Sequence, residues 1–185
     1  MTAHYMVCLD VSDKRCLVVG GGRVATEKAA GLVAAGARVT VVAPEIDDEL
    51  AALPVEVARR PFAVSDLVGR FLVIAATSDR FVNRSVSSAA RDRNIPCNVA
   101  DDPELCSFIL PAIVREGPIV AGVSTGGASP ALAQRLRDEI AELLTTRHAE
   151  LAERLASLRP WAKQQFATYD ERRDFFRELV AKELA

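Results

Sequence analysis

The stretch Cys16-Leu17-Val18-Val19-Gly20-Gly21-Gly22-Arg23-Val24-Ala25 decides the fold of this chain. Residues 16–19 form a short apolar run, and three glycines follow it. Residues 23–35 then carry apolar side chains at helical spacing and stop before Gly36. A buried strand, a tight turn and a helix in this order are typical of the start of a parallel α/β sheet. The sequence therefore predicts a strand, a glycine turn and a helix at the N-terminus.

Further strand and helix patterns extend this unit. The brief apolar runs at residues 38–42, 55–58, 71–75 and 96–99 predict strands, and residues 80–93 predict a helix. Strands that alternate with helices in this way favour a parallel sheet with helices on both faces and right-handed crossovers. We therefore assign residues 1–111 to a Rossmann domain in the α/β class.

The pattern changes after this domain. Two apolar runs, 107–114 and 119–124, are separated by Arg115-Glu116-Gly117-Pro118, which predicts a hairpin. Residues 130–144 predict a helix with Ser129 as N-cap and Pro130 at its first position. Because a hairpin and one helix cannot easily bury their own apolar faces, residues 112–146 are expected to form a dimerisation region of a homodimer. Residues 147–185 predict a small C-terminal helical domain with a break near Arg159-Pro160.

Composition narrows the class of protein. The chain has 185 residues, a formal net charge of -2 and a pI near 5.8, which gives no reason to expect nucleic acid or an anionic membrane as a partner. The four cysteines form no CxxC pair, so we expect neither a metal site nor a disulfide framework, and we interpret Cys16 and Cys97 as small buried hydrophobes. Charges interrupt the first twenty residues and no apolar run is long enough to span a bilayer. We expect a cytoplasmic protein.

The glycine stretch has the form GxGxxA, with Gly20, Gly22 and Ala25 at its small positions. Gly20 would permit the tight turn, Gly22 would let the backbone approach a pyrophosphate, and Ala25 would let helix and strand pack closely. Amides at the helix start, around Gly21, Arg23 and Val24, would hold the phosphates. The alternative is a glycine turn that merely connects a strand to a helix.

The residues after the second predicted strand are expected to lie near the adenosine ribose of such a cofactor. The strand is followed by Pro44 and Glu45, then by Asp47 and Asp48, and no basic residue appears until Arg59. Three acids without an arginine would repel a 2′-phosphate, which favours NAD over NADP. The alternative is that Pro44 redirects the backbone and leaves Glu45 in solvent.

Two later loops carry polar candidates. Ala76 and Thr77 follow the predicted strand 71–75 and could line the nicotinamide half of the cofactor site, although Ser78 or Asp79 could simply cap the next helix. Asp101 and Asp102 follow the predicted strand 96–99. Asp102 precedes a proline and suits a turn, so Asp101 is the better candidate for a catalytic carboxylate.

Several segments in a fixed order resemble the N-terminal module of siroheme synthase and the stand-alone precorrin-2 dehydrogenases, some of which are also sirohydrochlorin ferrochelatases. The resemblance runs from about Leu9 to Phe176. The matching segments are Val18-Val19-Gly20-Gly21-Gly22 with Ala25 and Glu27-Lys28, Ala75-Ala76-Thr77, Cys97-Asn98-Val99-Ala100-Asp101, Ser107-Phe108-Ile109-Leu110-Pro111, Val123-Ser124-Thr125-Gly126-Gly127-Ala128-Ser129-Pro130 and Gln165-Phe166-Ala167-Thr168.

The resemblance implies an NAD-dependent oxidation of precorrin-2 to sirohydrochlorin in siroheme biosynthesis, with Asp101 as the catalytic residue and a dimer formed by the region after the Rossmann domain. Two alternatives stay open: an enzyme that also inserts Fe²⁺ into sirohydrochlorin, and an NAD-sensing binding module of another class. The fused enzymes carry a methyltransferase domain, and we expect another protein to supply that step here.

The tetrapyrrole substrate carries several carboxylates, and two groups of residues are candidates to bind them. The segment Ser124, Thr125, Gly126 and Gly127 precedes a helix and could bind a carboxylate through backbone amides, or act only as the cap. Thr125 stands where some relatives carry a phosphorylated serine. Basic side chains could also supply positive charge, although solvated helix faces are the simpler interpretation of each one. These are Arg135, Arg137, Lys163, Arg172 and Arg173.

Overall fold

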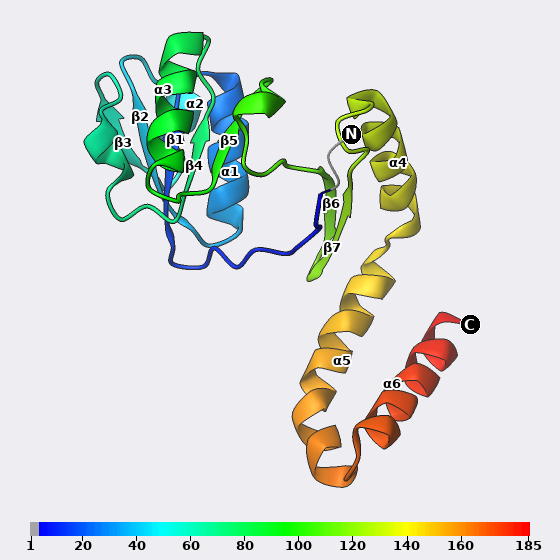
Figure 1. Ribbon diagram of the computed structural model, residues 1–185. Helices are drawn as coiled ribbons and strands as arrows, with labels where there is room; N and C mark the ends of the chain where they lie inside the picture. The colour runs from blue at the N-terminus through cyan, green and yellow to red at the C-terminus, as the bar shows by residue number, and fades with distance from the viewer. Residues whose placement is uncertain (1–3) are drawn as a thin grey trace. The chain divides into compact units, whose positions relative to one another are not determined.

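The computed structural model describes residues 4–185, which form two compact units, His4–Leu110 and Pro111–Ala185. Figure 1 shows the sheet of the first unit and the hairpin and helices of the second. Each unit has its own architecture.

The first unit is a five-stranded parallel sheet in the order β3-β2-β1-β4-β5. Its strands are β1 (Arg15–Val19), β2 (Arg38–Ala43), β3 (Glu56–Arg59), β4 (Leu72–Ala75) and β5 (Cys97–Val99). Its helices are α1 (Arg23–Ala34), α2 (Asp48–Ala51) and α3 (Arg80–Arg91), with short 3-10 turns at Val64–Leu67 and Pro103–Leu105. The predicted α/β fold class is confirmed.

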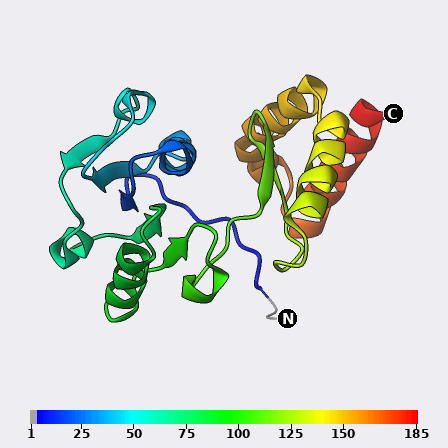
Figure 2. The same ribbon diagram turned by 90° about the horizontal axis from the view of Figure 1, so that it is seen from above.

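The central strand shows why both faces of the sheet are covered. Cys16 and Val18 of β1 belong to the apolar cluster beneath α1, whereas Leu17 and Val19 belong to the cluster beneath α3. All four side chains are at most 2% exposed, as expected for a strand buried on both faces. Figure 2 shows α1 and α3 on opposite sides of the sheet. Cys97 is also buried, so the interpretation of Cys16 and Cys97 as small hydrophobes is confirmed.

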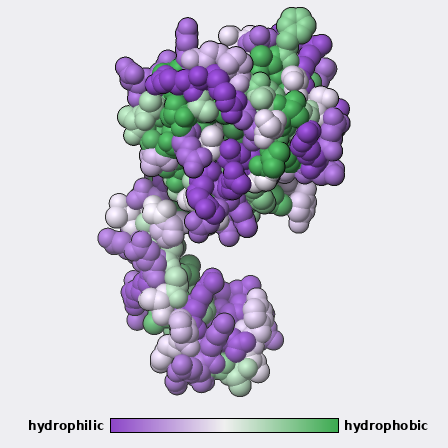
Figure 3. Space-filling model, turned by 90° about the vertical axis from the view of Figure 1, so that its left-hand side faces the viewer, coloured by the Kyte–Doolittle hydropathy of each residue, from purple (hydrophilic) through white to green (hydrophobic). Residues whose placement is uncertain are grey.

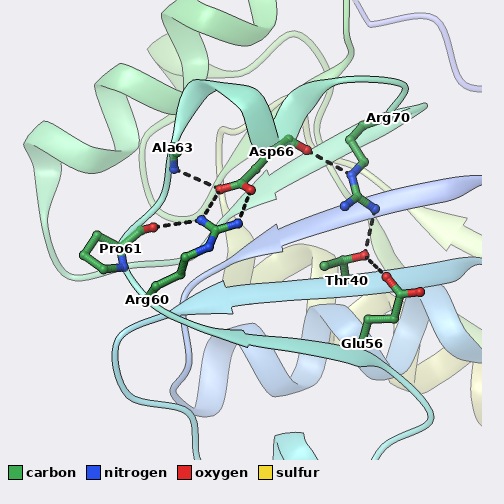
Figure 4. Close-up of polar contacts among 7 residues, drawn as sticks. All are labelled: Thr40, Glu56, Arg60, Pro61, Ala63, Asp66 and Arg70. Atoms are coloured by element: carbon green, nitrogen blue, oxygen red, sulfur yellow. Dashed lines mark hydrogen bonds and ion pairs between the residues drawn. The ribbon is translucent and has the colours of Figure 1, made fainter.

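Strands β2 and β3 are joined by a polar network, drawn in Figure 4. The hydroxyl of Thr40 on β2 donates to Glu56 of β3 (2.9 Å) and accepts a hydrogen bond from Arg70 (2.7 Å). Arg70 also donates to the backbone carbonyl of Asp66 (3.0 Å). The carboxylate of Asp66 in turn accepts from the guanidinium of Arg60 and from the amide of Ala63. The network fixes the Val64–Leu67 turn against β2 and β3, and every partly buried polar group in it has a partner.

The second unit begins with an antiparallel hairpin, β6 (Ala112–Glu116) and β7 (Ile119–Val123), in which Glu116 pairs with Ile119. The predicted hairpin is confirmed, but its first strand starts later than residue 107. Ser107 and Phe108 instead extend the first unit, because the amide of Ser107 donates to the carbonyl of Cys97 (2.8 Å) and Asn98 donates to the carbonyl of Phe108 (3.0 Å). An apolar run alone does not show which strand its backbone will bond.

Three helices follow the hairpin: α4 (Pro130–Leu143), α5 (Thr146–Gln165) and α6 (Tyr169–Leu184). Ser129 caps α4 by accepting from the amide of Leu132 (3.2 Å), and Pro130 occupies the first turn, both as predicted. Trp161, Phe166 and Phe175 form an aromatic cluster that packs α6 against α5. The face of these two helices seen in Figure 3 is mostly hydrophilic.

The predicted helix break near Arg159-Pro160 is wrong. Helix α5 continues through the exposed Pro160 to Gln165. The chain turns instead before Thr168, where the side chains of Thr168 and Glu171 cap α6 reciprocally. A proline inside a helix loses one hydrogen bond and crowds the carbonyl four residues before it, but packing along the rest of the helix can outweigh this cost. The pattern Thr-x-x-Glu at residues 168–171 marks the start of the next helix, so it locates the turn better than Pro160 does.

The ion pair at Asp66 predicts a pH dependence of stability. The hydrogen bond from Arg60 holds the pKa of the Asp66 carboxyl below its ordinary value. Because the folded-state pKa is the lower one, the carboxylate stabilises the fold above its unfolded-state pKa of about 3.9, and this contribution is lost as the pH falls toward the folded-state pKa. We expect Asp66→Asn to lower the Tm by roughly 5 °C at pH 7 and by less at pH 3.5.

Thermal melts of the wild type and the variant at both pH values measure this difference. Glu27→Gln removes an exposed acid of α1 and serves as the control that should change the Tm little at either pH. An equal loss at both pH values for Asp66→Asn would show that the ion pair is not its cause.

Candidate functional site

Four loops of the first unit meet at the carboxyl edge of its sheet. Backbone hydrogen bonds extend the strand ladders into these loops: the amide of Gly20 donates to the carbonyl of Val42 (3.0 Å), Ala76 donates to Val19 (2.7 Å) and Ala100 donates to Ala75 (2.9 Å). The predicted candidates at Gly20–Gly22, Pro44–Glu45, Ala76–Thr77 and Asp101 therefore follow four strands that end at one edge. Ligands of open α/β sheets bind at this edge.

The glycine loop is held between the loops on either side. A Cβ on Gly20 would lie 2.3 Å from the carbonyl oxygen of Ala76, and Gly20 has a φ of +132° that suits glycine alone. A Cβ on Gly21 would lie 1.8 Å from the carbonyl oxygen of Glu45. The GxGxxA pattern treats this second position as variable, so the sequence did not show that Gly21 is as restricted as Gly20.

Helix α1 begins directly after this loop without a side-chain cap. Gly22 is its N-cap residue and contributes no side-chain hydrogen bond. The first amides of a helix have no partner within the helix and carry the positive end of its dipole. Ala25 is fully buried, which brings α1 close to the sheet as predicted. Around Arg23 and Val24 the backbone thus offers donors to an anion such as a pyrophosphate.

The loop after β2 carries the predicted ribose acids. Pro44 and Glu45 are exposed, and it is the backbone of Glu45 that contacts Gly21. Arg59 lies beside the same loop, because β3 pairs with β2 and Nη1 of Arg59 donates to the carbonyl of Ile46 (3.0 Å). The expectation that no basic residue accompanies the acids is therefore wrong. That expectation assumed that a residue far from the acids in sequence is also far from them in the sheet.

Thr77 is fixed by a residue that the sequence did not single out. The buried Asn83 of α3 donates to the carbonyl of Thr77 (2.9 Å), and its side-chain oxygen lies 2.8 Å from the Thr77 hydroxyl. Asp79 caps α3 by accepting from the amides of Phe81 and Val82, as one of the two predictions for this loop stated. The loop that begins at Ala76 is thus rigidly attached to the start of α3.

Asp101 occupies the corner of a tight turn. The amide of Asp102 donates to the carbonyl of Val99 (3.4 Å), and Asp101 has a φ of +59° between them. Asp tolerates this left-handed conformation better than most residues. The side chain of Asp101 is exposed, whereas the less exposed Asp102 lies 3.6 Å from the guanidinium of Arg80. Asp101 is thus the more accessible carboxylate of the pair.

Cys106 holds both ends of this turn, a role that its position in the sequence did not indicate. Its Sγ accepts from the amide of Val99 (3.1 Å) and lies 3.3 Å from the carbonyl oxygens of Val99 and Asp102. Burial raises the pKa of the Cys106 thiol, which keeps it a neutral donor at neutral pH. The sequence did not indicate this role because the partners of Cys106 are backbone groups of an irregular loop.

The predicted substrate loop lies in the second unit. The hydroxyl of Thr125 accepts from the amide of Ser129 (3.1 Å) and donates to the carbonyl of Ser129 (3.0 Å), while Ser124 accepts from the amide of Gly126 (3.2 Å). Gly126 and Gly127 both have positive φ values. The Thr125 side chain is therefore engaged in shaping the loop that starts α4.

Four of the five basic candidates have partners within the second unit. Arg135 pairs with Glu139, Arg137 with Asp138, and Arg173 with two aspartates, whereas Arg172 donates to the carbonyl of Phe166. Exposed ion pairs of this kind contribute little stability.

Residues 4–185 contain neither a candidate metal site nor a candidate membrane span. No group of three or more His, Cys, Asp or Glu side chains in this range could hold a metal ion. No helix within the same residues is long and apolar enough to cross a membrane.

Comparison with known proteins agrees with this geometry. Residues 7–112, which contain the four loops, match the family described as putative NAD(P)-binding. The chain belongs to this NAD(P)-binding family. The prediction of a nicotinamide dinucleotide as cofactor is thereby confirmed at the level of NAD or NADP. Residues 122–143 match the family described as sirohaem biosynthesis protein central.

Relatives of this NAD(P)-binding chain confirm the predicted resemblance. It is 45% identical over 177 residues to a siroheme synthase of Methylobacillus flagellatus, covering 94% of this chain and 38% of the relative. A siroheme synthase of Nitrosomonas eutropha is 41% identical over 182 residues, covering 96% and 38%. The chain thus spans about two fifths of the length of these relatives. A solved structure described as SirC, precorrin-2 dehydrogenase, superposes with a TM-score of 0.79 and 26% identity over 98% of this chain and 93% of that chain.

The glycine loop yields a prediction that the motif alone does not make. We expect Gly21→Ala to destabilise the first unit by about 2 kcal/mol or more and to weaken NADH binding at least about tenfold, because the Cβ would collide with the Glu45 carbonyl. The matched control is Gly31→Ala, within α1, where a Cβ meets nothing within 4 Å. It should stabilise the protein by about 0.5–1 kcal/mol and leave binding unchanged.

Urea unfolding and titration with NADH, followed by nucleotide fluorescence, measure both effects. If Gly21→Ala binds NADH as the wild type does, the close approach to Glu45 is not needed for the site.

Proposed function

We propose that the chain oxidises precorrin-2 to sirohydrochlorin with NAD as the hydride acceptor. The observation that carries this proposal is the likeness to the SirC structure, described as a precorrin-2 dehydrogenase, over nearly the full length of both chains. The matches to siroheme synthases over most of this chain support the same pathway.

The residues at the sheet edge fit a bound dinucleotide. Gly20, Gly21 and Gly22 form a cradle that side chains would fill at the first two positions. In the proposed complex this loop and the amides of Arg23, Val24 and Ala25 hold the pyrophosphate. Pro44 and Glu45 lie at the adenosine ribose, and Ala76 and Thr77 lie at the nicotinamide ring.

The acids after β2 support NAD over NADP. Glu45 and Asp47 are exposed beside the glycine loop. Their negative charge opposes a 2′-phosphate, and a carboxylate can accept hydrogen bonds from ribose hydroxyls.

The proposed chemistry removes one hydride and one proton from the substrate. The bound nicotinamide ring supplies the acceptor for the hydride, that is, for a hydrogen together with the electron pair of the broken C–H bond. Asp101 is the proposed general base for the proton, because its carboxylate is exposed at the end of β5. The turn held by Cys106 fixes the backbone that presents Asp101. Exposure to solvent then lets the proton pass from the carboxylate to water.

The second unit is proposed to bind substrate and to form a homodimer. The proposed substrate loop consists of Ser124, Thr125, Gly126 and Gly127. The Thr125 hydroxyl shapes this loop, and its backbone amides bind the substrate carboxylates.

We place the reaction in the cytoplasm, since the four cysteines are free thiols, as is usual in a reducing compartment. These cysteines are Cys8, Cys16, Cys97 and Cys106.

The proposed activity predicts a large effect of Asp101→Asn. Asn tolerates the same positive φ, so the turn should persist while the base is lost. With anaerobic precorrin-2 and NAD, we expect the rate of NADH formation at 340 nm to fall by about 10²–10⁴-fold, with NAD binding nearly unchanged.

Asp102→Asn is the matched control, because it removes the neighbouring carboxylate that pairs with Arg80. It should cost far less activity. No NADH from a folded wild type that binds NAD would refute the dehydrogenase, whereas full activity of Asp101→Asn would refute only the role of Asp101.

The proposed dimer predicts that a variant of its interface has a lower mass in solution than the wild type. The open face of the hairpin exposes Ile113 and Val120, and α4 exposes Leu132 and Leu136. Burial of these side chains in an isologous contact would stabilise a dimer of about twice 19.9 kDa. Light scattering after size exclusion should give this mass for the wild type and a lower mass for Val120→Asp. A monomeric wild type at micromolar concentration would contradict the proposal.

A further inference from the structure

The start of α3 brings a guanidinium to the turn that carries Asp101. Nη2 of Arg80 lies 3.6 Å from Oδ2 of Asp102, the residue that follows Asp101. The start of α3 is itself fixed, because Asp79 caps its first amides and Asn83 bonds the loop before it. Arg80 is therefore a basic side chain placed beside the turn of the proposed base, within the same unit.

This ion pair leaves the guanidinium accessible. At 3.6 Å the two charged groups form an ion pair and not a hydrogen bond. The side chain of Arg80 is 76% exposed, and an ion pair with so exposed an arginine contributes little stability. The turn has its own support in the hydrogen bonds of Cys106. The N–H donors of Arg80 can therefore serve a ligand.

The residue after Arg80 adds an apolar surface at the same place. Phe81 occupies the second position of α3 and is 86% exposed. Covering an aromatic ring removes a large apolar area from water, which favours contact with another flat apolar surface. A single exposed aromatic residue is not unusual by itself. Here it adjoins an accessible arginine at the sheet edge where the glycine loop and Asp101 lie.

We propose that Arg80 and Phe81 bind the tetrapyrrole substrate, an assignment that rests on the proposed function. The substrate combines a macrocycle with carboxylates around its rim. Arg80 binds one rim carboxylate through its planar set of N–H donors, and the ring of Phe81 covers part of the macrocycle. The guanidinium also offsets the negative charge of Asp101 and Asp102, which would otherwise repel a polyanionic substrate.

Arg80 differs from the basic candidates that the sequence suggested. Those candidates all lie in the second unit, where four of the five have partners. Arg80 reaches the turn after β5 because β4, which precedes α3, pairs with β5 in the sheet. Its position thus supplies positive charge in the unit that contains Asp101.

Anaerobic titration with metal-free sirohydrochlorin, the proposed product, tests the assignment without turnover, because the pigment absorbs and fluoresces in visible light. We expect Arg80→Ala to raise its Kd about tenfold at low salt and by less at about 0.5 M salt, which screens the charge. Arg80→Lys should recover part of the affinity. Phe81→Ala should raise the Kd by a similar factor at both salt concentrations, because an apolar contact is not screened.

Two controls separate ligand binding from effects of charge and folding. Arg84→Ala removes an exposed arginine one turn further along α3 and should leave the Kd unchanged. An equal rise in this variant would assign the effect to net charge and overturn the role of Arg80. Asp102→Asn should bind the pigment equally or more tightly, since a repulsive charge is removed. If it weakens binding as Arg80→Ala does, the ion pair only supports the turn and the assignment is wrong.

The outcomes distinguish this inference from the proposed function. A wild type that forms NADH from precorrin-2 and NAD, with an unchanged Kd for the pigment in folded Arg80→Ala and Phe81→Ala, would overturn this inference alone. A wild type that forms no NADH would refute the dehydrogenase, whereas binding that depends on Arg80 would still support a site for a carboxylated macrocycle. A lower mass of Phe81→Ala with an unchanged Kd would assign its ring to a contact between two copies. Circular dichroism of each variant verifies that it is folded.

Discussion

The close approach of backbone to backbone at Gly20 and Gly21 is the constraint on which the site depends. A Cβ at either position would overlap a carbonyl oxygen, that of Ala76 after β4 or that of Glu45 after β2. The loop after β1 therefore lies directly between the loops of its two neighbouring strands. This contact fixes where α1 begins and leaves the first amides of α1 without a side-chain cap. The nucleotide-binding edge thus depends on two residues without side chains in the loop that follows the central strand.

Much of the fold of both units could be predicted from the sequence, because the signals are local or periodic. The apolar runs 16–19, 38–42 and 71–75 correspond to buried strands, and Asp79 and Ser129 cap helices where their residue types suggest. The errors occurred where a distant partner decides. Arg59 reaches the acidic loop only because β3 pairs with β2, and Pro160 is tolerated because the rest of α5 is packed. Neither partner can be read from neighbouring residues.

The candidate site divides in the same way. The glycine loop and Asp101 follow predicted strands, so their position at one edge could be inferred from the order of strands alone. The residues that fix the loops in place could not be inferred from the sequence. Asn83 fixes Thr77 from the helix that follows it, and Cys106 bonds backbone groups at both ends of the turn that carries Asp101. Such contacts depend on the geometry of irregular backbone, for which a single sequence offers no periodic signal.

The predicted polar residues therefore differ in what they can offer a ligand. The hydroxyls of Thr77 and Thr125 are engaged with groups of their own loops, and their roles follow from the backbone that they shape. The Asp101 carboxylate is exposed at a turn with a left-handed residue, a conformation that costs energy and persists because Cys106 and the strand ends hold it. Asp13 and Asn94 adopt the same left-handed conformation before β1 and β5, so this conformation alone does not mark a site. Asp101 differs from them because it follows β5, at the edge where the nucleotide loop lies, and this position together with its exposed carboxylate is the argument for proposing chemistry there.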